Sequence, residues 1–299
     1  MIKKTARWYT YILMAAAGLL IGRGLQGLWW DYPLRALLWD QAIMEPLVAF
    51  WGYDWSDWVT NPSVEKSIQQ LVRSCAIYLL LCAALLLPSL RKRPIARWLL
   101  SGAGVLVIGL VLLGTKEQFW RFGYLLEHAL QMGAVFLAIN VAAQGVLGTL
   151  RPWIRLLTVA TFIGHGLYAI GFYPIPYHFV LMTTEGLDFI FGASNHAGAA
   201  DFTGAGLSPE AARFILLIVG GLDFLAAICL LLPSKKAQQL GLYWIIPWAI
   251  LTTLARLWAN GQYSSWENLL FLWTPEFLFR LPHIFLPLAL WKGGGASTR

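Results

Sequence analysis

Charged residues are scarce in this chain. Only 12% of its 299 residues are Asp, Glu, Lys or Arg, whereas a soluble globular domain carries about 25%. Several apolar runs are longer than the roughly 20 residues with which an α-helix crosses the hydrocarbon of a bilayer. Together with a mean hydropathy of +0.62, this composition excludes an ordinary soluble domain. It predicts an all-α integral membrane protein in contact with the lipid bilayer.

Cysteine is also rare, and several catalytic motifs are absent. The three cysteines, Cys75, Cys82 and Cys229, all fall in apolar runs, and no CxxC pair occurs. This excludes a disulfide framework and a thiol redox pair, so we expect these residues to fill small spaces between helices. The sequence contains no P-loop, no GxSxG and no Rossmann fingerprint, which removes the commonest nucleotide-binding and hydrolase motifs.

Basic residues exceed acidic ones, which gives a net charge of +7 and a pI near 9.4. They lie in short segments between apolar runs and form no basic stripe, so we expect no nucleic-acid partner. The positive-inside rule predicts that both termini lie in the cytoplasm, in a bacterial inner membrane. The basic clusters that support this orientation occur at residues 3–7, 91–97, 151–155, 235–236 and 292.

We expect eight transmembrane helices. The first could also be a secretory signal peptide, since a basic start precedes an apolar stretch and small residues. An internal repeat argues against this, because the first helix has a counterpart in the middle of the chain. The expected helices lie near residues 8–30, 70–90, 97–114, 124–148, 153–174, 211–233, 241–259 and 270–291.

Motifs recur between the two halves of the chain. GRGL, which begins at Gly22, matches GHGL, which begins at Gly164, and the segment after Glu127 matches the segment after Glu276. The matched positions are 140 to 149 residues apart, and such nearly constant spacing indicates duplication. Because four is an even number, both copies of a four-helix unit cross the membrane in the same direction, as parallel repeats. We expect these repeats at residues 1–150 and 151–299.

Two long segments connect the first and second helix of each repeat, at 31–69 and 175–210. They are too polar to span, and we expect them to lie as helices in the outer interface. We expect Ser208 to cap the helix that follows the second segment, with Pro209 in the first position and Glu210 in the first turn. Tryptophans of the first segment suit headgroup depth, although a ligand cage is an alternative; they are Trp29, Trp30, Trp39, Trp51, Trp55 and Trp58.

The sequence resembles the DoxX-like superfamily of four-helix membrane proteins. The resemblance rests on a basic residue in the first helix, an outer segment that contains proline, and the run LDFLAAICLLLPSKKAQQLGLYWII, which begins at Leu222. It covers each repeat once, and therefore nearly the whole chain. Asp223 stands where the family often has an acid in the second helix, whereas the first copy has Tyr78. The resemblance implies a four-helix fold for each repeat and, for some members, a subunit linked to quinone reduction.

Ionisable residues inside the predicted spans need partners, because an unpaired charge there costs at least about 2.5 kcal/mol. Arg23 and Glu127 each lie seven residues from a tryptophan at the outer interface, on helices that run in opposite directions. We therefore predict an ion pair between them, and the same pair between His165 and Glu276 in the second repeat. Such pairs can serve packing alone, and we assign Arg23 and Glu127 that structural role.

The second repeat carries further polar residues. Glu276, Arg280 and His283 follow the spacing i, i+4, i+7, which places them on one face of a helix. With His165, Asp223 and Arg256 they predict a polar pocket that opens outward, whose members bind a ligand or handle protons. An anionic headgroup, a quinone oxygen or a proton in transit would suit it. The same pattern assigns no catalytic residue.

Metal and haem sites have weaker support. His165 and His283 could act as two axial haem ligands, but no CxxCH or HxxxH motif supports this, and haem is not the expected cofactor. Asn195, His196 and Asp201 lie close together in the second outer segment, but zinc needs more donors. We expect no metal site.

Three functions remain open. The first is a DoxX-like membrane subunit that binds a quinone or another small amphipathic redox partner, together with a membrane or soluble partner subunit. The second is a carrier or binding protein for a lipid or small anion. The third is a structural or assembly subunit whose buried charges hold two bundles together. Whether the protein is an enzyme is left open by these residues.

Overall fold

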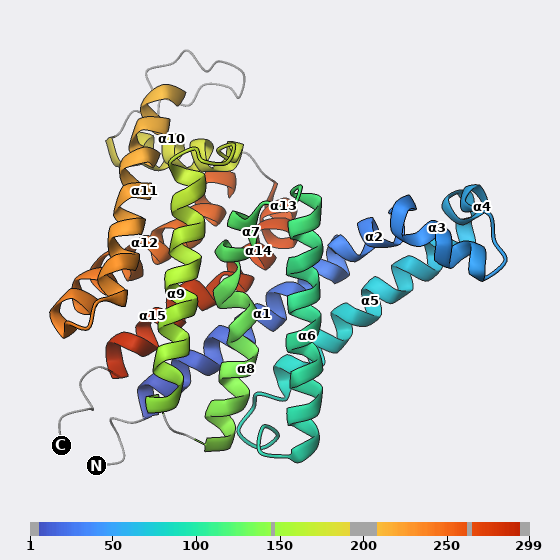
Figure 1. Ribbon diagram of the computed structural model, residues 1–299, viewed down its shortest axis with the longest axis horizontal. Coiled ribbons are helices and arrows are strands. Elements are labelled where there is room, and N and C mark those ends of the chain that lie inside the picture. Colours follow the sequence, from blue (N-terminus) through green and yellow to red (C-terminus); the bar gives the residue numbers. More distant parts are fainter. Residues whose placement is uncertain (1–5, 145–146, 192–207, 262–264, 294–299) are drawn as a thin grey trace.

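The computed structural model describes residues 6–144, 147–191, 208–261 and 265–293. In these residues all regular structure is helical (Figure 1), as the composition predicts. The long helices are α1 (Ala6–Trp29), α5 (Pro62–Ala84), α6 (Pro94–Glu117), α8 (Ala129–Gln144), α9 (Leu147–Ala169), α11 (Pro209–Leu231), α12 (Lys235–Gly261) and α15 (Leu281–Gly293). The others are α2 (Pro33–Leu38), α3 (Gln41–Phe50), α4 (Trp55–Thr60), α7 (Phe122–Glu127), α10 (Tyr177–Phe191), α13 (Trp266–Asn268), the π-helical turn η1 (Leu269–Trp273) and α14 (Thr274–Phe279).

Within the described residues, seven stretches are long and apolar enough to cross a bilayer. The chain is therefore a polytopic integral membrane protein that contacts lipid. The eighth expected span corresponds to α9, which is long enough at 23 residues but carries Arg151 and Arg155 in its first three turns; this span stays a prediction. The seven stretches are Trp8–Trp29, Pro62–Ala84, Pro94–Glu117, Phe122–Ala143, Pro209–Leu231, Lys235–Ala259 and Trp266–Gly293.

Local capping chemistry fixes where two helices begin. The Ser208 hydroxyl accepts a hydrogen bond from the backbone N–H of Ala211 at 3.2 Å, which confirms the predicted start of α11. α5 begins at Pro62, earlier than the predicted residue 70, because the Asn61 side chain accepts from the N–H of Ser63 at 2.8 Å. Proline favours the first helical position. The first turns of α5 are polar, so hydropathy alone does not reveal them.

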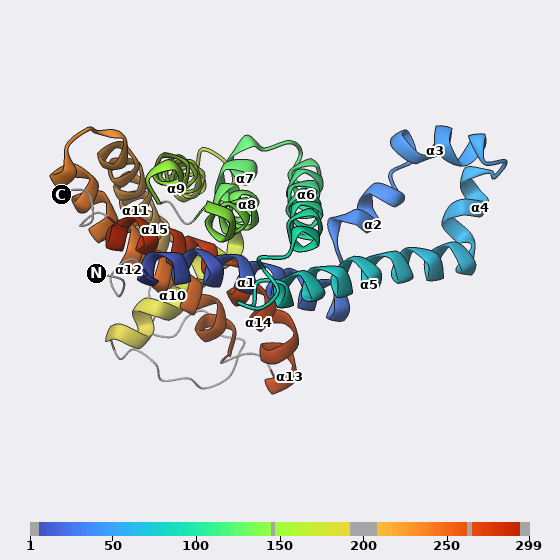
Figure 2. The ribbon, with the colours of Figure 1, turned by 90° about the horizontal axis from the view of Figure 1, so that it is seen from below.

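Helices from the two halves of the chain are interleaved. α1 packs against α5 and α8, and also against α14 and α15 near the other end of the chain. α9 packs against α7 and α8 as well as against α11 and α15. In Figure 2, α6, α8 and α9 are seen almost end-on beside α1. The first long helix of each half is thus in contact with the last helices of the other half.

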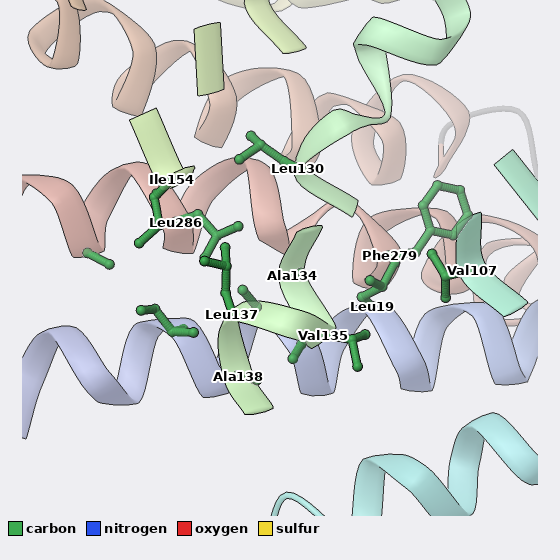
Figure 3. Packing of buried hydrophobic residues seen from close by; sticks show 14 of the residues in the cluster. Leu19, Val107, Leu130, Ala134, Val135, Leu137, Ala138, Ile154, Phe279 and Leu286 are labelled. Carbon is green, nitrogen blue, oxygen red and sulfur yellow. The ribbon is translucent and has the colours of Figure 1, made fainter. Parts of the chain in front are cut away.

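The apolar core lies where these helices meet. Leu19 of α1, Leu137 of α8, Ile154 of α9 and Leu286 of α15 are at most 5% exposed. In Figure 3, Leu137 lies near Leu286 and Ile154, and Leu19 lies beside Phe279. In lipid, burial of such side chains gives little hydrophobic driving force between helices, because lipid tails are equally apolar. Close packing of the side chains therefore contributes more to the association of the helices than the buried apolar area does.

An arm made of α2, α3, α4 and the first half of α5 projects from one side of the bundle (Figures 1 and 2). Arg35 pairs with Asp31 and with Glu65, the latter at 2.6 Å. Lys116 of α6 pairs with Asp40, and its hydrogen bond holds the pKa of the Asp40 carboxyl below its ordinary value. This ion pair between arm and bundle is therefore formed at neutral pH and is lost when acid protonates Asp40.

Two glycines bring helix backbones into direct contact. A methyl group at Gly22 of α1 would lie 2.4 Å from the backbone nitrogen of Phe279. A methyl group at Gly164 of α9 would lie 2.4 Å from the backbone nitrogen of Glu127. Small residues allow this close approach between membrane helices. α1 is thereby held against α14, and α9 against α7.

We predict that Gly22→Ala and Gly164→Ala each destabilise the protein, because the added methyl group must push two backbones apart. Overpacking of this kind costs about 1–3 kcal/mol. Gly109→Ala is the matched control, since its methyl group would meet no atom within 4 Å and alanine favours a helix by up to about 1 kcal/mol. Thermal unfolding in detergent measures the effect. Equal melting temperatures for Gly22→Ala and Gly109→Ala would contradict the close approach.

Candidate functional site

The last long helix of each half is interrupted inside the bundle, although the sequence analysis treats each as one helix. His128 separates α7 from α8, and Arg280 separates α14 from α15. At the first break, Nδ1 of the His128 ring lies 2.9 Å from the carbonyl oxygen of Tyr124. The ring therefore competes with the backbone N–H groups of the helix for this acceptor. At the second, Pro282 has no N–H to donate. Interrupted spans are tolerated only inside protein, and they often mark binding sites.

Glu127 lies at the first break and joins three helices. Its Oε1 is 3.3 Å from Nη2 of Arg280 and 3.6 Å from Nε2 of His165. The side chains of Glu127, Arg280 and His165 are at most 10% exposed. The carboxylate therefore connects α7 with α9 and with the break between α14 and α15.

His283 connects the two breaks. Its Nδ1 is 3.0 Å from the carbonyl oxygen of Arg280, and its Nε2 is 3.3 Å from the carbonyl oxygen of Glu127. Both neighbours are acceptors, and a neutral imidazole has only one N–H, so only the protonated ring could donate to both. The ring also stacks on His165 with the centroids 5.5 Å apart and the planes at 9°. Two titratable rings thus lie face to face beside Glu127.

Arg23 of α1 is only 5% exposed and contacts neutral groups. Its guanidinium donates to the side-chain oxygens of Gln26 and Gln131, both at 2.9 Å, and lies 4.2 Å from the ring centre of Phe279. Within the described residues, its Nε has no hydrogen-bond partner. The Tyr32 hydroxyl donates to the Arg23 carbonyl at 2.6 Å and fixes this end of α1.

Arg256 of α12 also belongs to this site. It is 3% exposed and pairs with Glu276 at 3.1 Å, while the Glu276 side chain is 31% exposed. His178 of α10 lies nearby: burial, together with the positive charges of Arg256 and Arg280, lowers its pKa to about 3. α10 therefore places a neutral imidazole near this end of the site at physiological pH.

We call this group the central polar cluster. When its histidines are neutral, three arginines and two glutamates leave one positive charge in excess among these described residues. The cluster comprises Arg23, Glu127, His128, Gln131, His165, Arg256, Glu276, Arg280 and His283.

Both predicted ion pairs are wrong. Arg23 bonds to Gln131, one turn beyond Glu127, while Glu127 pairs with Arg280 and His165. Glu276 pairs with Arg256 in place of His165. The physical reason is the interleaving of the two halves, which brings α9 and the α14–α15 break to Glu127. Spacing along the chain predicts how deep a residue lies in the membrane, but it does not predict which helix lies beside that residue.

Asp223 was predicted to belong to the pocket, but the described contacts place it elsewhere. It is 1% exposed, and its Oδ1 accepts a hydrogen bond from Nε1 of Trp244 at 2.8 Å, between α11 and α12. This partner, the indole of Trp244, is neutral and lies outside the central polar cluster. The remaining predicted residues, His165, Arg256, Glu276, Arg280 and His283, do lie in the cluster.

Sequence reasoning missed the contributions of Gln131, His128 and His178. The signal for Gln131 was its position four residues after Glu127, which places both on one helical face. His128 directly follows Glu127, and in a continuous helix it would point about 100° away from it, but the helix is interrupted at this residue. His178 lies in an outer segment, and nothing local indicates that it faces the bundle.

The stacked pair of histidine rings does not resemble axial haem ligation. His165 and His283 stack face to face, whereas two axial ligands point nitrogen atoms toward each other from opposite sides of an iron. Within the described residues, no group of three or more His, Cys, Asp or Glu could hold a metal ion. Asn195, His196 and Asp201 lie outside the described residues. The three cysteines are free, with Cys82 and Cys229 buried.

Comparison with protein families, with curated proteins and with solved structures gives no significant match. The site is therefore interpreted from its own chemistry.

We predict strong energetic coupling between Glu127 and Arg280. Glu127→Leu leaves Arg280 as a buried cation without its acid, and breaking such a pair costs about 3–5 kcal/mol. The double variant Glu127→Leu/Arg280→Met removes both charges and should recover much of this loss. A thermal-unfolding cycle of the single and double variants in detergent measures the coupling.

The cycle of Glu127→Leu with Arg23→Met is the control, because Arg23 bonds to Gln131 and not to Glu127. It should give a smaller coupling energy. Stronger coupling of Glu127 to Arg23 than to Arg280 would restore the pairing expected from sequence and overturn the geometry described above.

Proposed function

We propose that this chain is a DoxX-like membrane subunit that binds a quinone, or another small amphipathic molecule with an oxygen-bearing head, at the central polar cluster. The observation that carries the proposal is Arg23, a buried cation whose described partners are all neutral. A charged side chain inside a membrane span normally pairs with an opposite charge or faces a polar cavity. An electron-rich oxygen of a ligand would supply an acceptor for Nε of Arg23, which has none among the described residues.

Arg280 offers a second donor to such a ligand. Its Nη2 is used by Glu127, but its Nε has no hydrogen-bond partner among the described residues. The free Nε groups of Arg23 and Arg280 both belong to the cluster, and carbonyl or carboxylate oxygens are suitable acceptors for guanidinium groups. Positive charge in excess also favours an anionic or polarised head.

Protons could be exchanged at the same site. His283 lies between two carbonyl oxygens that only a protonated ring could satisfy together. Its charge state depends on its surroundings, which include His165 from α9, Arg280 beside it, and Glu127 and His128 from the first break. Binding of an oxygen-bearing head near Arg280 would change the electrostatic balance at His283. We therefore expect ligand binding and protonation of His283 to be coupled.

Two other functions have support of their own. A carrier for a lipid or small anion would use the same excess of positive charge without redox chemistry. A structural or assembly subunit is favoured by the two ion pairs Glu127–Arg280 and Glu276–Arg256, which neutralise both acids within the chain. The ligand-binding proposal is preferred because these pairs leave Arg23 without an acidic partner among its described contacts.

We further propose that the chain is a tandem duplication of one four-helix unit, with all eight helices spanning. Contacts of the two glycines support this. The methyl position at Gly22 faces Pro275 O and Phe279 N, and that at Gly164 faces Gly123 O and Glu127 N, with the same spacing in both pairs. In this register Phe279, and not Glu276, corresponds to Glu127. Each unit would donate its first helix to the last helix of the other unit.

The proposed location is a bacterial inner membrane with both termini in the cytoplasm. Basic residues support it, because they lie before α6, at the start of α9 and at the start of α12. These helix ends lie together toward the bottom of Figure 1, where α1 begins and α15 ends. Positive residues at one end of a bundle favour the cytoplasmic side.

We predict that a quinone or another oxygen-headed amphiphile co-purifies with the protein in mild detergent and is released by organic extraction for mass spectrometry. Arg23→Gln and Arg280→Gln should each lower the binding of a short-chain ubiquinone analogue at least tenfold, because each removes a charge-assisted donor worth about 1.5–3 kcal/mol. Arg93→Gln, an exposed arginine outside the cluster, is the matched control. Size-exclusion profiles report whether each variant is folded.

Unchanged binding in folded Arg23→Gln and Arg280→Gln protein would contradict the site. Loss of folded protein in both variants, with no co-purified amphiphile in the wild type, would favour the structural function instead.

We predict the orientation from accessibility to an impermeant thiol reagent in intact cells. In a background that lacks the three native cysteines, Ser56→Cys in the arm should react and Ser234→Cys before α12 should not. Both serines are exposed, so the difference reports the side of the membrane. Labelling of Ser234→Cys alone would reverse the topology, and labelling of both in equal amounts would contradict the placement of the two residues on opposite sides.

A further inference from the structure

A basic cavity lies at the end of the bundle opposite α10, far from the central polar cluster along α9 and α12. It has a volume of about 190 Å³ and is lined by residues of α9, α11, α12 and α15. A single water molecule requires only about 10–15 Å³ of cavity volume. The cavity therefore has room for a polar group much larger than a single water.

Positive charge gathers in this cavity without acidic partners. Arg151, Arg155 and Lys235 line it, and none of its described lining residues is acidic. Arg151 and Arg155 are one helical turn apart, where like charges repel. Arg155 donates only to the neutral side chain of Gln238, at 3.1 Å, and Nε of Arg151 is buried without a hydrogen-bond partner among the described residues. Among the described lining residues, these cations have no anion that would make their proximity favourable.

The start of α12 adds to the positive potential. Lys235 is the first residue of this 27-residue helix, and a helix N-terminus carries a partial positive charge that favours anions. The Ser234 hydroxyl accepts a hydrogen bond from the backbone N–H of Ala237 at 3.4 Å. This cap does not occupy the other backbone N–H groups of the first turn.

Part of the cavity lining is apolar. Leu230, Leu242 and Leu290 are at most 6% exposed, and Trp291 lies beside them at the end of α15. The Trp291 ring packs edge-on against Tyr243, with centroids 4.6 Å apart. Tryptophan and tyrosine are typical of the boundary between lipid and water. Cations above an apolar wall at this depth match a molecule with an anionic head and a hydrocarbon tail.

We propose that this cavity binds the phosphate group of an anionic phospholipid from the surrounding leaflet. Basic pockets between transmembrane helices are known to take such headgroups. Arg151, Arg155 and Lys235 would contact the phosphate oxygens, while Leu290 and Trp291 would contact the start of the acyl chains. The lipid would hold the start of α12 to the start of α9. The site differs from the central polar cluster and does not depend on the function proposed for it.

Thermal unfolding of the full chain in detergent tests this proposal with three probes. Phosphatidylglycerol in mixed micelles should raise the melting temperature, since a ligand that binds only the folded state stabilises it. Phosphatidylcholine at the same concentration should not, because its head has no net charge. Inorganic phosphate at the same concentration should not either, because it lacks the tail that the apolar wall would contact.

The double variant Arg151→Gln/Arg155→Gln should bind phosphatidylglycerol at least tenfold more weakly. Arg93→Gln/Arg97→Gln removes the same charge from exposed positions at the start of α6 and is the matched control. Lys235→Gln changes an exposed side chain, so it should weaken binding without disturbing the fold and keeps the test valid if the double variant fails to fold. Native mass spectrometry of retained lipid gives a second readout.

Equal stabilisation of both double variants by phosphatidylglycerol would overturn the site. Stabilisation by inorganic phosphate as large as that by phosphatidylglycerol would show a free-anion site and overturn its assignment to a lipid.

Discussion

The ionic contact of Glu127 is the constraint on which the rest of the bundle depends. A carboxylate in hydrocarbon is tolerated only with a partner, and this one is shared between Arg280 and His165. Its carbonyl oxygen also faces His283. These partners come from α9 and from the α14–α15 break, so the two halves of the chain must be assembled before Glu127 can be buried. The interleaved order of helices follows from that requirement as much as from packing.

The helix breaks and the small residues serve the same arrangement. His128 and Arg280 leave regular helical geometry where polar side chains converge, which exposes carbonyl oxygens to His283 rather than to lipid. Gly22 and Gly164 let the neighbouring helices approach closely enough for these bonds to form. Neither feature would be stable alone, because an open break in hydrocarbon leaves unsatisfied backbone groups. The close approach protects the breaks, and the breaks supply the polar contacts.

The sequence predicts what depends on local composition. Membrane class, helical fold, free cysteines and the Ser208 cap all follow from hydropathy or from a few neighbouring residues. Contacts between side chains of different helices cannot be predicted from local composition. Arg23 and Glu127 can be assigned a depth by counting residues, but Arg23 finds Gln131, one turn away, because neighbouring helices and their rotation are set by tertiary packing. Asp223 was grouped with the cluster for the same reason, although its side chain bonds to Trp244.

The two polar sites differ in how their charges are neutralised, and this difference gives them different physical roles. In the central polar cluster, acids neutralise two of the three arginines, so changes in protonation or in a bound ligand act on a nearly balanced network. In the basic cavity, the described lining offers no acid, so its three cations repel one another until an anion arrives. A site of the first kind can respond to a ligand, because its interactions can be redistributed among several partners. In the basic cavity, the bound anion itself supplies the stabilisation. This suits a permanently bound lipid better than a molecule in transit.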